Sequence, residues 1–344
     1  MTAEAHAPVR RGEAGGPARL AVVATGAVLA LVVALAASIG IGAYSATPVE
    51  IVRALTGSVP GELRDVLLTL RIPRTVLAVL TGAALAAAGA LMQGLTRNPL
   101  ADPGILGVNA GAGLAVAVAV GGLGITAPAA LVPFAAVGAL LATLVVHAIG
   151  AAARGPLDPS RLVLGGVAVG AVLSGISSML VLLDPRAFDA MRSWVVGSVS
   201  VDGWHRVLPA VPVVLGGLVL ALAVARGLDS IAMGDDLAAA LGVHLGRVRA
   251  LTVIAITALC AASVAASGPI GFVGLMAPHV VRLLVGGGYR RVLLFSLLVG
   301  PVIVLVADVV GRLVVQPAEM PAGIVTAFVG AIALAVLIRR DRRA

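Results

Sequence analysis

The chain has 344 residues, of which 60% are hydrophobic and 12% charged, and its mean hydropathy is +1.11. Soluble globular proteins are about half apolar and a quarter charged, so this composition excludes a water-soluble globule, a disordered chain and a collagen-like repeat. The net charge of +8 comes from 24 arginines against 16 acids, with no lysine, and a P-loop nucleotide site is excluded because it requires a lysine.

Ten apolar stretches follow an arginine-bearing N-terminal tail of residues 1–19, and a helix that crosses a bilayer needs about 20 such residues. They are Leu20–Ala43, Val76–Leu95, Gly104–Ile125, Ala127–Ala153, Leu162–Leu183, Val207–Ala225, Ala250–Gly268, Pro269–Leu284, Val292–Leu313 and Pro321–Ile338. The first is longer than the apolar core of a secretory signal, about 7–15 residues, so we expect a spanning helix rather than a cleaved signal. The eighth is short and contains Pro278; omitting it leaves nine spans.

The arginines favour ten spans with both termini on the cytoplasmic side. In that arrangement sixteen of the 24 arginines lie inside and the acids divide equally between the two sides. Arginine is enriched in cytoplasmic segments, so the high pI reflects membrane orientation and no nucleic-acid partner is expected. The sequence predicts a multi-pass protein of a bacterial plasma membrane, with a permease domain over residues 20–340 and cytoplasmic tails at 1–19 and 341–344.

The first outer segment, residues 44–75, begins with a predicted surface helix over Pro48–Leu55 and ends in Arg71-Ile72-Pro73-Arg74. Arginines at a helix end commonly reach toward water or lipid headgroups. Arg71 and Arg74 lie on the side where arginine is disfavoured, and paired guanidiniums suit capture of carboxylates on a docking partner.

Two inner segments carry turn and helix signals. Asn98 and Asp102 each precede a proline, Pro99 and Pro103, and are therefore expected to break the chain between spans. Asn109 follows among small residues and is expected to form an interhelical hydrogen bond. Within residues 226–249, a short helix bounded by Gly234 and Gly242 is either a lever for a cytoplasmic partner or a plain surface helix.

Few groups could support chemistry. Asp308 and Arg312 are spaced i, i+4 and are expected to pair. His279 has no second ligand at metal spacing, and the single cysteine, Cys260, excludes a disulfide and a cysteine-rich zinc site. No catalytic triad or acid–base dyad is present, so we expect neither enzymatic activity nor a cofactor or metal on this chain.

The segments after the second and seventh spans correspond weakly, as in an inverted repeat.

These motifs make the chain resemble the FecCD-type permeases, the membrane subunits of ABC importers for ferric siderophores, haem and cobalamin. The match runs from Tyr44 to Arg340. It rests on Arg71-Ile72-Pro73-Arg74, Gly89-x3-Gln93, Arg97-Asn98-Pro99-Leu100-Ala101-x-Pro103, Leu106-Gly107-x3-Gly111-Ala112, Trp194-x2-Gly197-Ser198, Gly234-Asp235-x2-Ala238-x2-Leu241-Gly242, Gly271-Phe272-Val273-Gly274-Leu275-x2-Pro278-His279-x2-Arg282, Ala307-Asp308-x3-Arg312 and Glu319-x-Pro321-x-Gly323.

The resemblance implies an all-α polytopic membrane protein of about ten helices with type II ABC importer architecture. It also implies a second permease subunit (the same chain or a related one), cytoplasmic ABC ATPase subunits that hold ATP and Mg²⁺, and an extracytoplasmic substrate-binding protein. Four groups of residues follow from it: binding-protein docking by Arg71, Arg74 and Arg312; ATPase coupling by Gly234, Asp235, Asp236, Ala238, Leu241 and Gly242; a translocation path and gate at Arg154, Arg161, Gly165, Gly166, Gly170 and Ser174; and motif residues Gln93, Asn98, Pro99, Pro103, Asn109, Pro278, His279 and Asp308.

The expected function is therefore import of a ferric siderophore by alternating access, with haem or cobalamin as alternative cargo. An ion-coupled secondary transporter is the main alternative from another class. It requires carboxylates within the membrane, and the span interiors offer essentially none besides Asp308. A membrane sensor without transport is a further alternative.

Overall fold

The computed structural model describes residues 16–42, 47–56, 61–152, 159–315 and 318–341, and in these segments all regular elements are helical. In chain order they are α1 (Pro17–Gly40), α2 (Pro48–Leu55), α3 (Gly61–Val66), η1 (Leu67–Arg71), α4 (Ile72–Thr96), η2 (Pro103–Leu106), α5 (Val108–Gly121), α6 (Pro128–Ala152), α7 (Pro159–Leu183), α8 (Pro185–Trp194), α9 (Val207–Ala232), α10 (Asp235–Ala240), α11 (Leu245–Ser267), α12 (Val273–Val285), α13 (Tyr289–Val314) and α14 (Ala322–Asp341).

Each of the ten apolar stretches forms a helix, as predicted. Seven helices of the described residues are long and apolar enough to cross a membrane, whereas α5, α12 and the apolar part of α14 are shorter. With 14 and 13 residues, α5 and α12 are about 20 Å long, less than the roughly 30 Å hydrocarbon core. The eighth stretch is therefore a short helix, as its sequence indicated, and the third is shorter than predicted.

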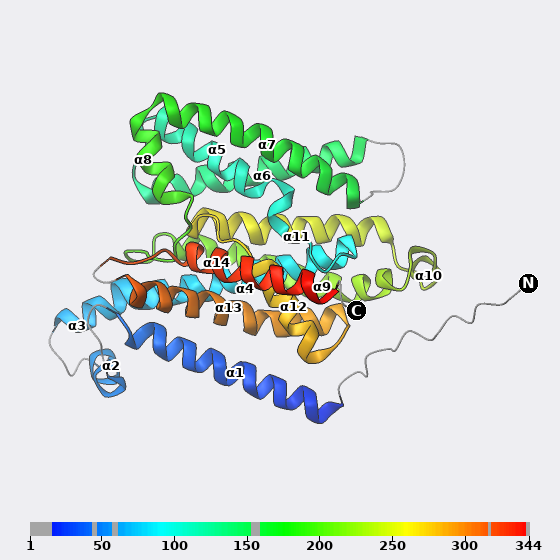
Figure 1. Ribbon diagram of the computed structural model, residues 1–344, viewed down its shortest axis with the longest axis horizontal. Helices are drawn as coiled ribbons and strands as arrows, with labels where there is room; N and C mark the ends of the chain where they lie inside the picture. Colours follow the sequence, from blue (N-terminus) through cyan, green and yellow to red (C-terminus); the bar gives the residue numbers. More distant parts are fainter. Residues whose placement is uncertain (1–15, 43–46, 57–60, 153–158, 316–317, 342–344) are drawn as a thin grey trace, which may run out of the picture.

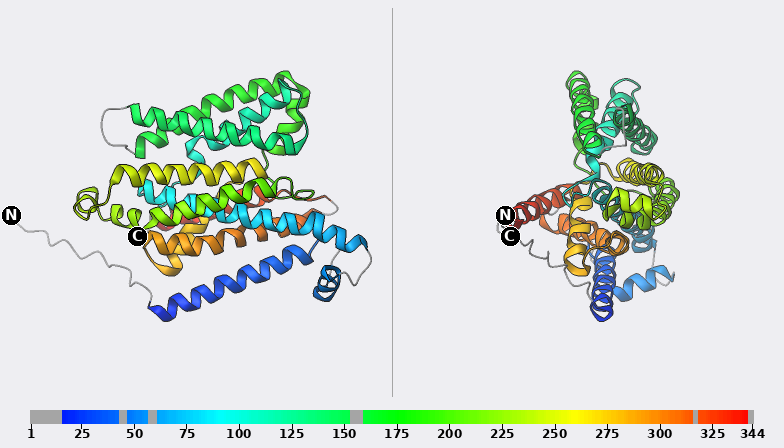
Figure 2. Two further views of the ribbon diagram at one scale, coloured as in Figure 1. Left: turned by 180° about the vertical axis from the view of Figure 1, so that it is seen from behind. Right: turned by 90° about the vertical axis from the view of Figure 1, so that its right-hand side faces the viewer.

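The long helices run roughly alongside one another, and the short ones mark the two ends of the bundle (Figure 1). One end, called the α8 end, carries α2, α3 and α8. The opposite end, called the α10 end, carries α10 together with the start of α1 and the end of α14. The views in Figure 2 place α5, α6 and α7 on one side of α11 and α1 on the far side of the bundle.

The predicted surface helix over Pro48–Leu55 is α2, and a capping box begins it. The backbone N–H of Glu50 donates to the Thr47 hydroxyl over 3.4 Å, while the Thr47 N–H donates to the Glu50 carboxylate over 2.8 Å. This arrangement satisfies two N–H groups that a helix start otherwise leaves without acceptors. The hydrogen bonds from Thr47 lower the pKa of Glu50 below its ordinary value.

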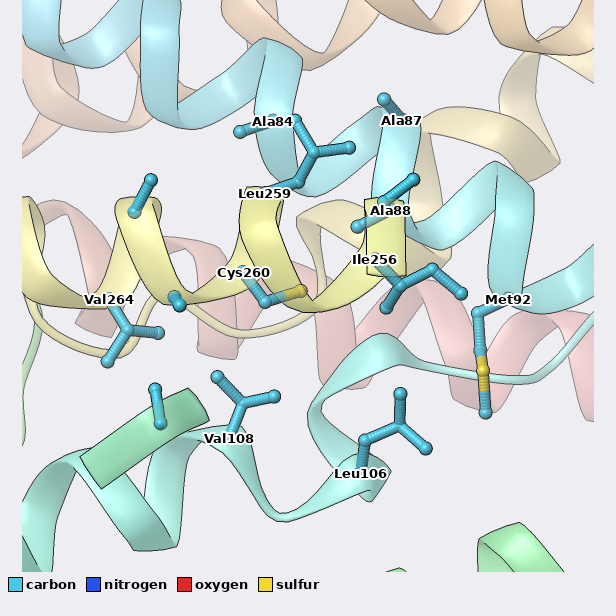
Figure 3. Close-up of a cluster of buried hydrophobic side chains, with 14 of the residues drawn as sticks. Ala84, Ala87, Ala88, Met92, Leu106, Val108, Ile256, Leu259, Cys260 and Val264 are labelled. Carbon is cyan, nitrogen blue, oxygen red and sulfur yellow. The ribbon is translucent and has the colours of Figure 1, made fainter. Parts of the chain in front are cut away.

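Helix α4 lies at the centre of the core and packs against α13, α11, α12 and α9. Its small side chains Ala84, Ala87 and Ala88 face Ile256 and Leu259 of α11 (Figure 3). Alanine at such contacts lets two backbones approach closely, which suits helix association in lipid. The free thiol of α11 is buried in this same cluster, among apolar side chains.

Two glycines of α4 allow backbone contact with neighbouring helices. A Cβ atom on Gly89 would overlap the carbonyl oxygen of Gly274 in α12, and one on Gly82 would meet the backbone of α13 at Gly300 and Pro301. The narrowest helix crossings of the core therefore depend on the absence of a side chain at these positions.

We expect Gly89→Ala to lower the free energy of unfolding by about 3 kcal/mol, because a methyl group at this site must push two backbones apart. Gly216→Ala is the matched control: this glycine is also helical, in α9, but nothing lies within 4 Å of the point that an added methyl group would occupy. The control should be neutral or more stable by up to about 1 kcal/mol. Equal unfolding midpoints of the two variants in detergent would contradict this account of the crossing.

The predicted chain breaks at Asn98 and Asp102 lie between α4 and η2. Arg97 ends α4 in the left-handed region at φ 52°, and the Asn98 and Asp102 side chains accept hydrogen bonds from the Leu100 and Gly104 N–H groups. A further break, between α11 and α12, lies against this segment: a methyl group on Gly274 would come within 2.9 Å of Pro103 Cδ. Each break is followed by a short helix, and the correspondence of the two segments as an inverted repeat stays a prediction.

Candidate functional site

A buried cluster of charges at the α8 end is organised around Asp308 of α13. Its carboxylate, 1% exposed, accepts hydrogen bonds from Arg74 of α4 at 2.8–3.1 Å and forms the predicted i, i+4 ion pair with Arg312. Arg74 also donates to the more exposed Glu319 over 2.7 Å. Two guanidiniums thus share one buried carboxylate, which offsets the cost of removing all three charges from water.

Two arginines of this cluster cap the C-terminus of α1. Arg71 Nη1 donates to the carbonyl oxygens of Ile39 and Gly40 at 2.7 and 3.1 Å. Arg312 Nη1 donates to those of Ser38 and Ile41 at 2.8 and 2.9 Å. The last carbonyls of a helix lack intrahelical donors and carry partial negative charge, so the two guanidiniums anchor the end of a helix that is otherwise largely exposed.

This geometry corrects one expectation about orientation. The sequence predicts outward guanidiniums at Arg71 and Arg74, yet Arg71 is only 6% exposed and, like Arg312, is directed into the protein. Burial is possible because the C-terminus of α1 and Asp308 supply acceptors that local sequence does not reveal. Of the three predicted docking arginines, Arg74 lies nearest the surface, with Glu319 as its outer partner.

At the α10 end, Asp235 links three segments of the chain. It is the first residue of α10, and its carboxylate pairs with Arg97, at the end of α4, and with Arg249 of α11, the latter at 2.7 Å. Arg97 also donates to the Ile231 carbonyl of α9 over 2.7 Å. Burial raises the pKa of Asp235, but hydrogen bonds and charge from Arg249 and Arg97 outweigh it, so the pKa lies below its ordinary value.

Helix α10 is bounded as predicted but sits in a shorter loop. Gly234 and Gly242 have φ values of 120° and 81°, conformations that side chains rarely adopt. Ala238 faces the protein, whereas Leu237 and Leu241 are 49% and 60% exposed one turn apart. The predicted loop of residues 226–249 is reduced to 233–244, because α9 continues to Ala232 and α11 begins at Leu245.

The predicted path residues of α7 do not share one environment. Ser174 lines a pocket, and nothing lies within 4 Å of a methyl group on Gly170. Gly166 instead packs against the Ile105 carbonyl of η2, which makes it a helix contact rather than an open surface, and Gly165 is near Ile149 of α6. Of the predicted gate residues, Arg161 lies in the first turns of α7 and Arg154 falls outside the described residues.

The predicted motif residues of α4 and α12 contact each other. Gln93 Nε2 donates to the carbonyl oxygens of Gly274 and Leu275, both at 3.4 Å, and its Oε1 accepts from Arg282. Arg282 in turn lies 5.7 Å above the ring of Tyr289.

Pro278 and His279 lie within α12, and Pro278 is buried. The Asn109 side chain, in contrast, forms no hydrogen bond among the described residues, so the predicted interhelical bond is not found there.

Several partners were missed by reasoning from sequence. Glu319 at Arg74, and Arg97 and Arg249 at Asp235, are separated from these residues by 14 to 245 positions. The predicted topology could have suggested the Asp235 ion pairs, because it already placed Arg97, Arg249 and Asp235 on the same, inner side of the membrane. No group of three or more potential metal ligands occurs among the residues whose positions are described.

Comparison with known proteins gives a consistent result. Residues 29–340 match the FecCD transport family. The chain is 42% identical to the ferric enterobactin transport system permease of Escherichia coli, over 94% of this chain and 96% of that protein. It is 37% identical to the cobalamin import system permease of Halobacterium salinarum, over 83% and 77%. A metal-chelate type ABC transporter solved in an inward-facing conformation aligns with a TM-score of 0.81 and 29% identity, covering 93% of this chain and 99% of that one.

Proposed function

Because the chain belongs to the FecCD transport family, we propose that it is the membrane-spanning permease subunit of an ATP-driven importer of ferric siderophores. The observation that most strongly supports this proposal is the 42% sequence identity, over nearly the full length, to a ferric enterobactin permease. Cobalamin is a second candidate cargo, supported by the 37% identity to a cobalamin permease. Haem is the remaining alternative within the family.

ATP hydrolysis is assigned to separate ABC ATPase subunits at the α10 end, and a substrate-binding protein to the α8 end. A second permease, identical or related, completes the pathway. This assignment places the protein in a bacterial plasma membrane with cytoplasmic tails at residues 1–19 and 341–344 and a permease domain over 20–340. A secondary transporter is disfavoured because Asp308, the carboxylate such a carrier would need, is held by two guanidiniums.

The test is uptake of radiolabelled iron chelate into proteoliposomes that contain the permease, its ATPase and the binding protein. The permease assignment requires ATP-dependent uptake that disappears when the catalytic glutamate of the ATPase is replaced by glutamine. Uptake that persists with that ATPase variant would exclude an ABC importer and favour ion coupling.

Docking of the binding protein is proposed to use Arg74 directly and Arg71 and Arg312 indirectly. Arg74 is the outermost of the three, and its partner Glu319 is 42% exposed, so a carboxylate of the binding protein could replace Glu319. Arg71 and Arg312 hold the end of α1 beneath this contact and add positive potential.

We expect Arg74→Gln to weaken binding-protein association about tenfold at low salt, because a charge-assisted contact is lost. Glu319→Gln should leave association unchanged or strengthen it, since the internal competitor for Arg74 is removed. The affinity of the binding protein for the complex in nanodiscs, measured at two salt concentrations, reports both effects. Unchanged affinity in a stably folded Arg74→Gln variant would remove Arg74 from the docking surface.

Coupling to the ATPase is proposed for α10 and its boundaries, namely Gly234, Asp235, Asp236, Ala238, Leu241 and Gly242. The exposed leucines offer an apolar contact, and the Asp235 ion pairs would transmit its movement to α4 and α11. The translocation path is proposed along α7 at Gly165, Gly170 and Ser174, with an inner gate near Arg154 and Arg161.

A further inference from the structure

A pocket of about 500 Å³, lined mainly by apolar side chains together with a few polar ones, lies between α5, α7 and α8. Its polar lining consists of Asn109 of α5, Ser174, Ser177 and Ser178 of α7, and Arg192 and Trp194 at the end of α8. A neighbouring cavity of about 620 Å³ between α5, α6 and α7 is lined by apolar residues and glycine. The polar groups of the first pocket are therefore a local feature of that site.

Two polar side chains that line this pocket, the half-buried Asn109 and the exposed Ser174, form no side-chain hydrogen bond with any described residue. The Ser177 and Ser178 hydroxyls donate to the α7 carbonyls of Leu173 and Ser174 at 2.8 and 2.9 Å. The Asn109 amide and the Ser174 hydroxyl form no such bond and remain available as donors. Donors that line a pocket without a protein partner favour a ligand with oxygen acceptors.

The position at which α5 begins adds a preference for a negatively charged ligand. Because η2 and Gly107 break the chain, α5 begins inside the protein, and its first-turn residues Asn109 and Ala110 line the pocket. Gly107 provides no side-chain cap, so the first turn of α5, which contributes Asn109 and Ala110 to the lining, keeps the partial positive charge of a helix start.

The lining of the pocket combines a cation with aromatic faces. The Arg192 side chain is exposed, forms no ion pair or hydrogen bond with any described residue, and is the charged member of the described pocket lining. Trp194 and Phe188 lie beside it. Guanidinium next to aromatic rings suits a ligand that carries both negative charge and flat apolar surface.

We infer that this pocket is a binding site for anionic ferric chelates on their way through the permease, with Arg192 and Trp194 as the cationic and aromatic groups and Asn109 and Ser174 as neutral donors of its lining. The inference rests on the proposed import function and specifies the charge class of the cargo. The pocket volume lies within the range of 300–1,000 Å³ that is typical of small-molecule sites.

Trp194 provides a direct readout of occupancy. The chain has two tryptophans, and Trp204 is not among the residues that line the pocket, so a Trp204→Phe variant of the full chain reports from the site alone. In nanodiscs, we expect saturable quenching of Trp194 by a triply anionic ferric tris-catecholate complex, and at least tenfold weaker binding of an uncharged ferric trihydroxamate complex.

In that background, Arg192→Gln should weaken binding of the anionic complex at least tenfold and leave the uncharged one within twofold. Asn109→Ala and Ser174→Ala should each weaken it three- to tenfold. Arg186→Gln is the charge-matched control on the same helix, since Arg186 pairs with Asp184 outside the pocket lining; it should change nothing. Equal effects of the two arginine variants, or equal quenching in a Trp194→Phe variant that retains Trp204, would overturn the site.

Uptake measured in parallel separates this inference from the import function. ATP-driven uptake of the anionic complex without saturable Trp194 quenching would refute the pocket and leave the importer intact. Saturable, Arg192-dependent quenching without uptake of any iron chelate would refute the importer and support the pocket as a site for anionic ligands.

Discussion

Replacing Asp308 with alanine is expected to lower the free energy of unfolding by about 3–5 kcal/mol, the range measured when one partner of a buried ion pair is removed. The carboxylate is 1% exposed and is shared by Arg74 and Arg312, so its loss leaves the buried Arg312 without a counter-charge and leaves Arg74 with Glu319 alone. Arg312 also caps α1 through the Ser38 and Ile41 carbonyls. The variant should therefore loosen α1 as well as α13.

Denaturant unfolding in detergent measures the stability change, and hydrogen exchange of α1 measures the loosening. Glu319→Gln is the matched control, because it removes the other carboxylate on Arg74 at a position that is 42% exposed; an exposed pair contributes about 0–1 kcal/mol. Asp308→Asn should fall between the two, since the amide oxygen still accepts hydrogen bonds. An Asp308→Ala variant as stable as Glu319→Gln would show that the cluster does not hold the α8 end together.

The contrast between Arg312 and Arg74 shows what sequence can and cannot predict about this cluster. The pairing of Asp308 with Arg312 follows from helical spacing, because residues four apart share a face. Arg74 is 234 positions from Asp308 and reaches it only because α4 packs on α13. Local pattern thus identified the residues but predicted an outward orientation, which tertiary contacts overrode.

The helices were predictable because a bilayer requires long apolar segments, and hydropathy reads that requirement directly. The boundaries of the helices were harder to predict than their presence. Helix α9 continues past the polar Arg226 to Ala232, since backbone hydrogen bonding does not stop where the hydrocarbon does. The predicted third span instead begins as η2, because Pro103 and the left-handed Gly107 interrupt it before α5 can start.

The short helix predicted between Gly234 and Gly242 is present as α10, within those limits, and its role as a lever stays a prediction. Gly234 and Gly242 adopt positive φ values at the two ends, as helix-bounding glycines commonly do. The ion pairs of Asp235 with Arg97 and Arg249 were not predictable, because they join three segments through the fold. These pairs are the physical route by which a force on α10 would reach α4 and α11.

Replacing Leu237 and Leu241 together with aspartate is expected to weaken association with the ATPase subunits at least about 100-fold, or about 2.7 kcal/mol. The two side chains lie one turn apart on α10, are 49% and 60% exposed, and are thus free for an apolar contact with a partner. Burying a carboxylate in such a contact without a counter-charge opposes binding strongly.

The control is the double replacement of Leu237 and Leu241 with methionine, which keeps apolar surface of similar size and should retain near-normal ATPase affinity. Because both leucines project from the permease, the aspartate variant should unfold at nearly the same temperature as the parent chain, so lost association cannot be attributed to misfolding. Its ATP-driven uptake should fall in parallel with ATPase binding. Normal ATPase affinity in the aspartate variant would exclude the exposed face of α10 as the coupling surface and require that force enter the permease elsewhere at the α10 end.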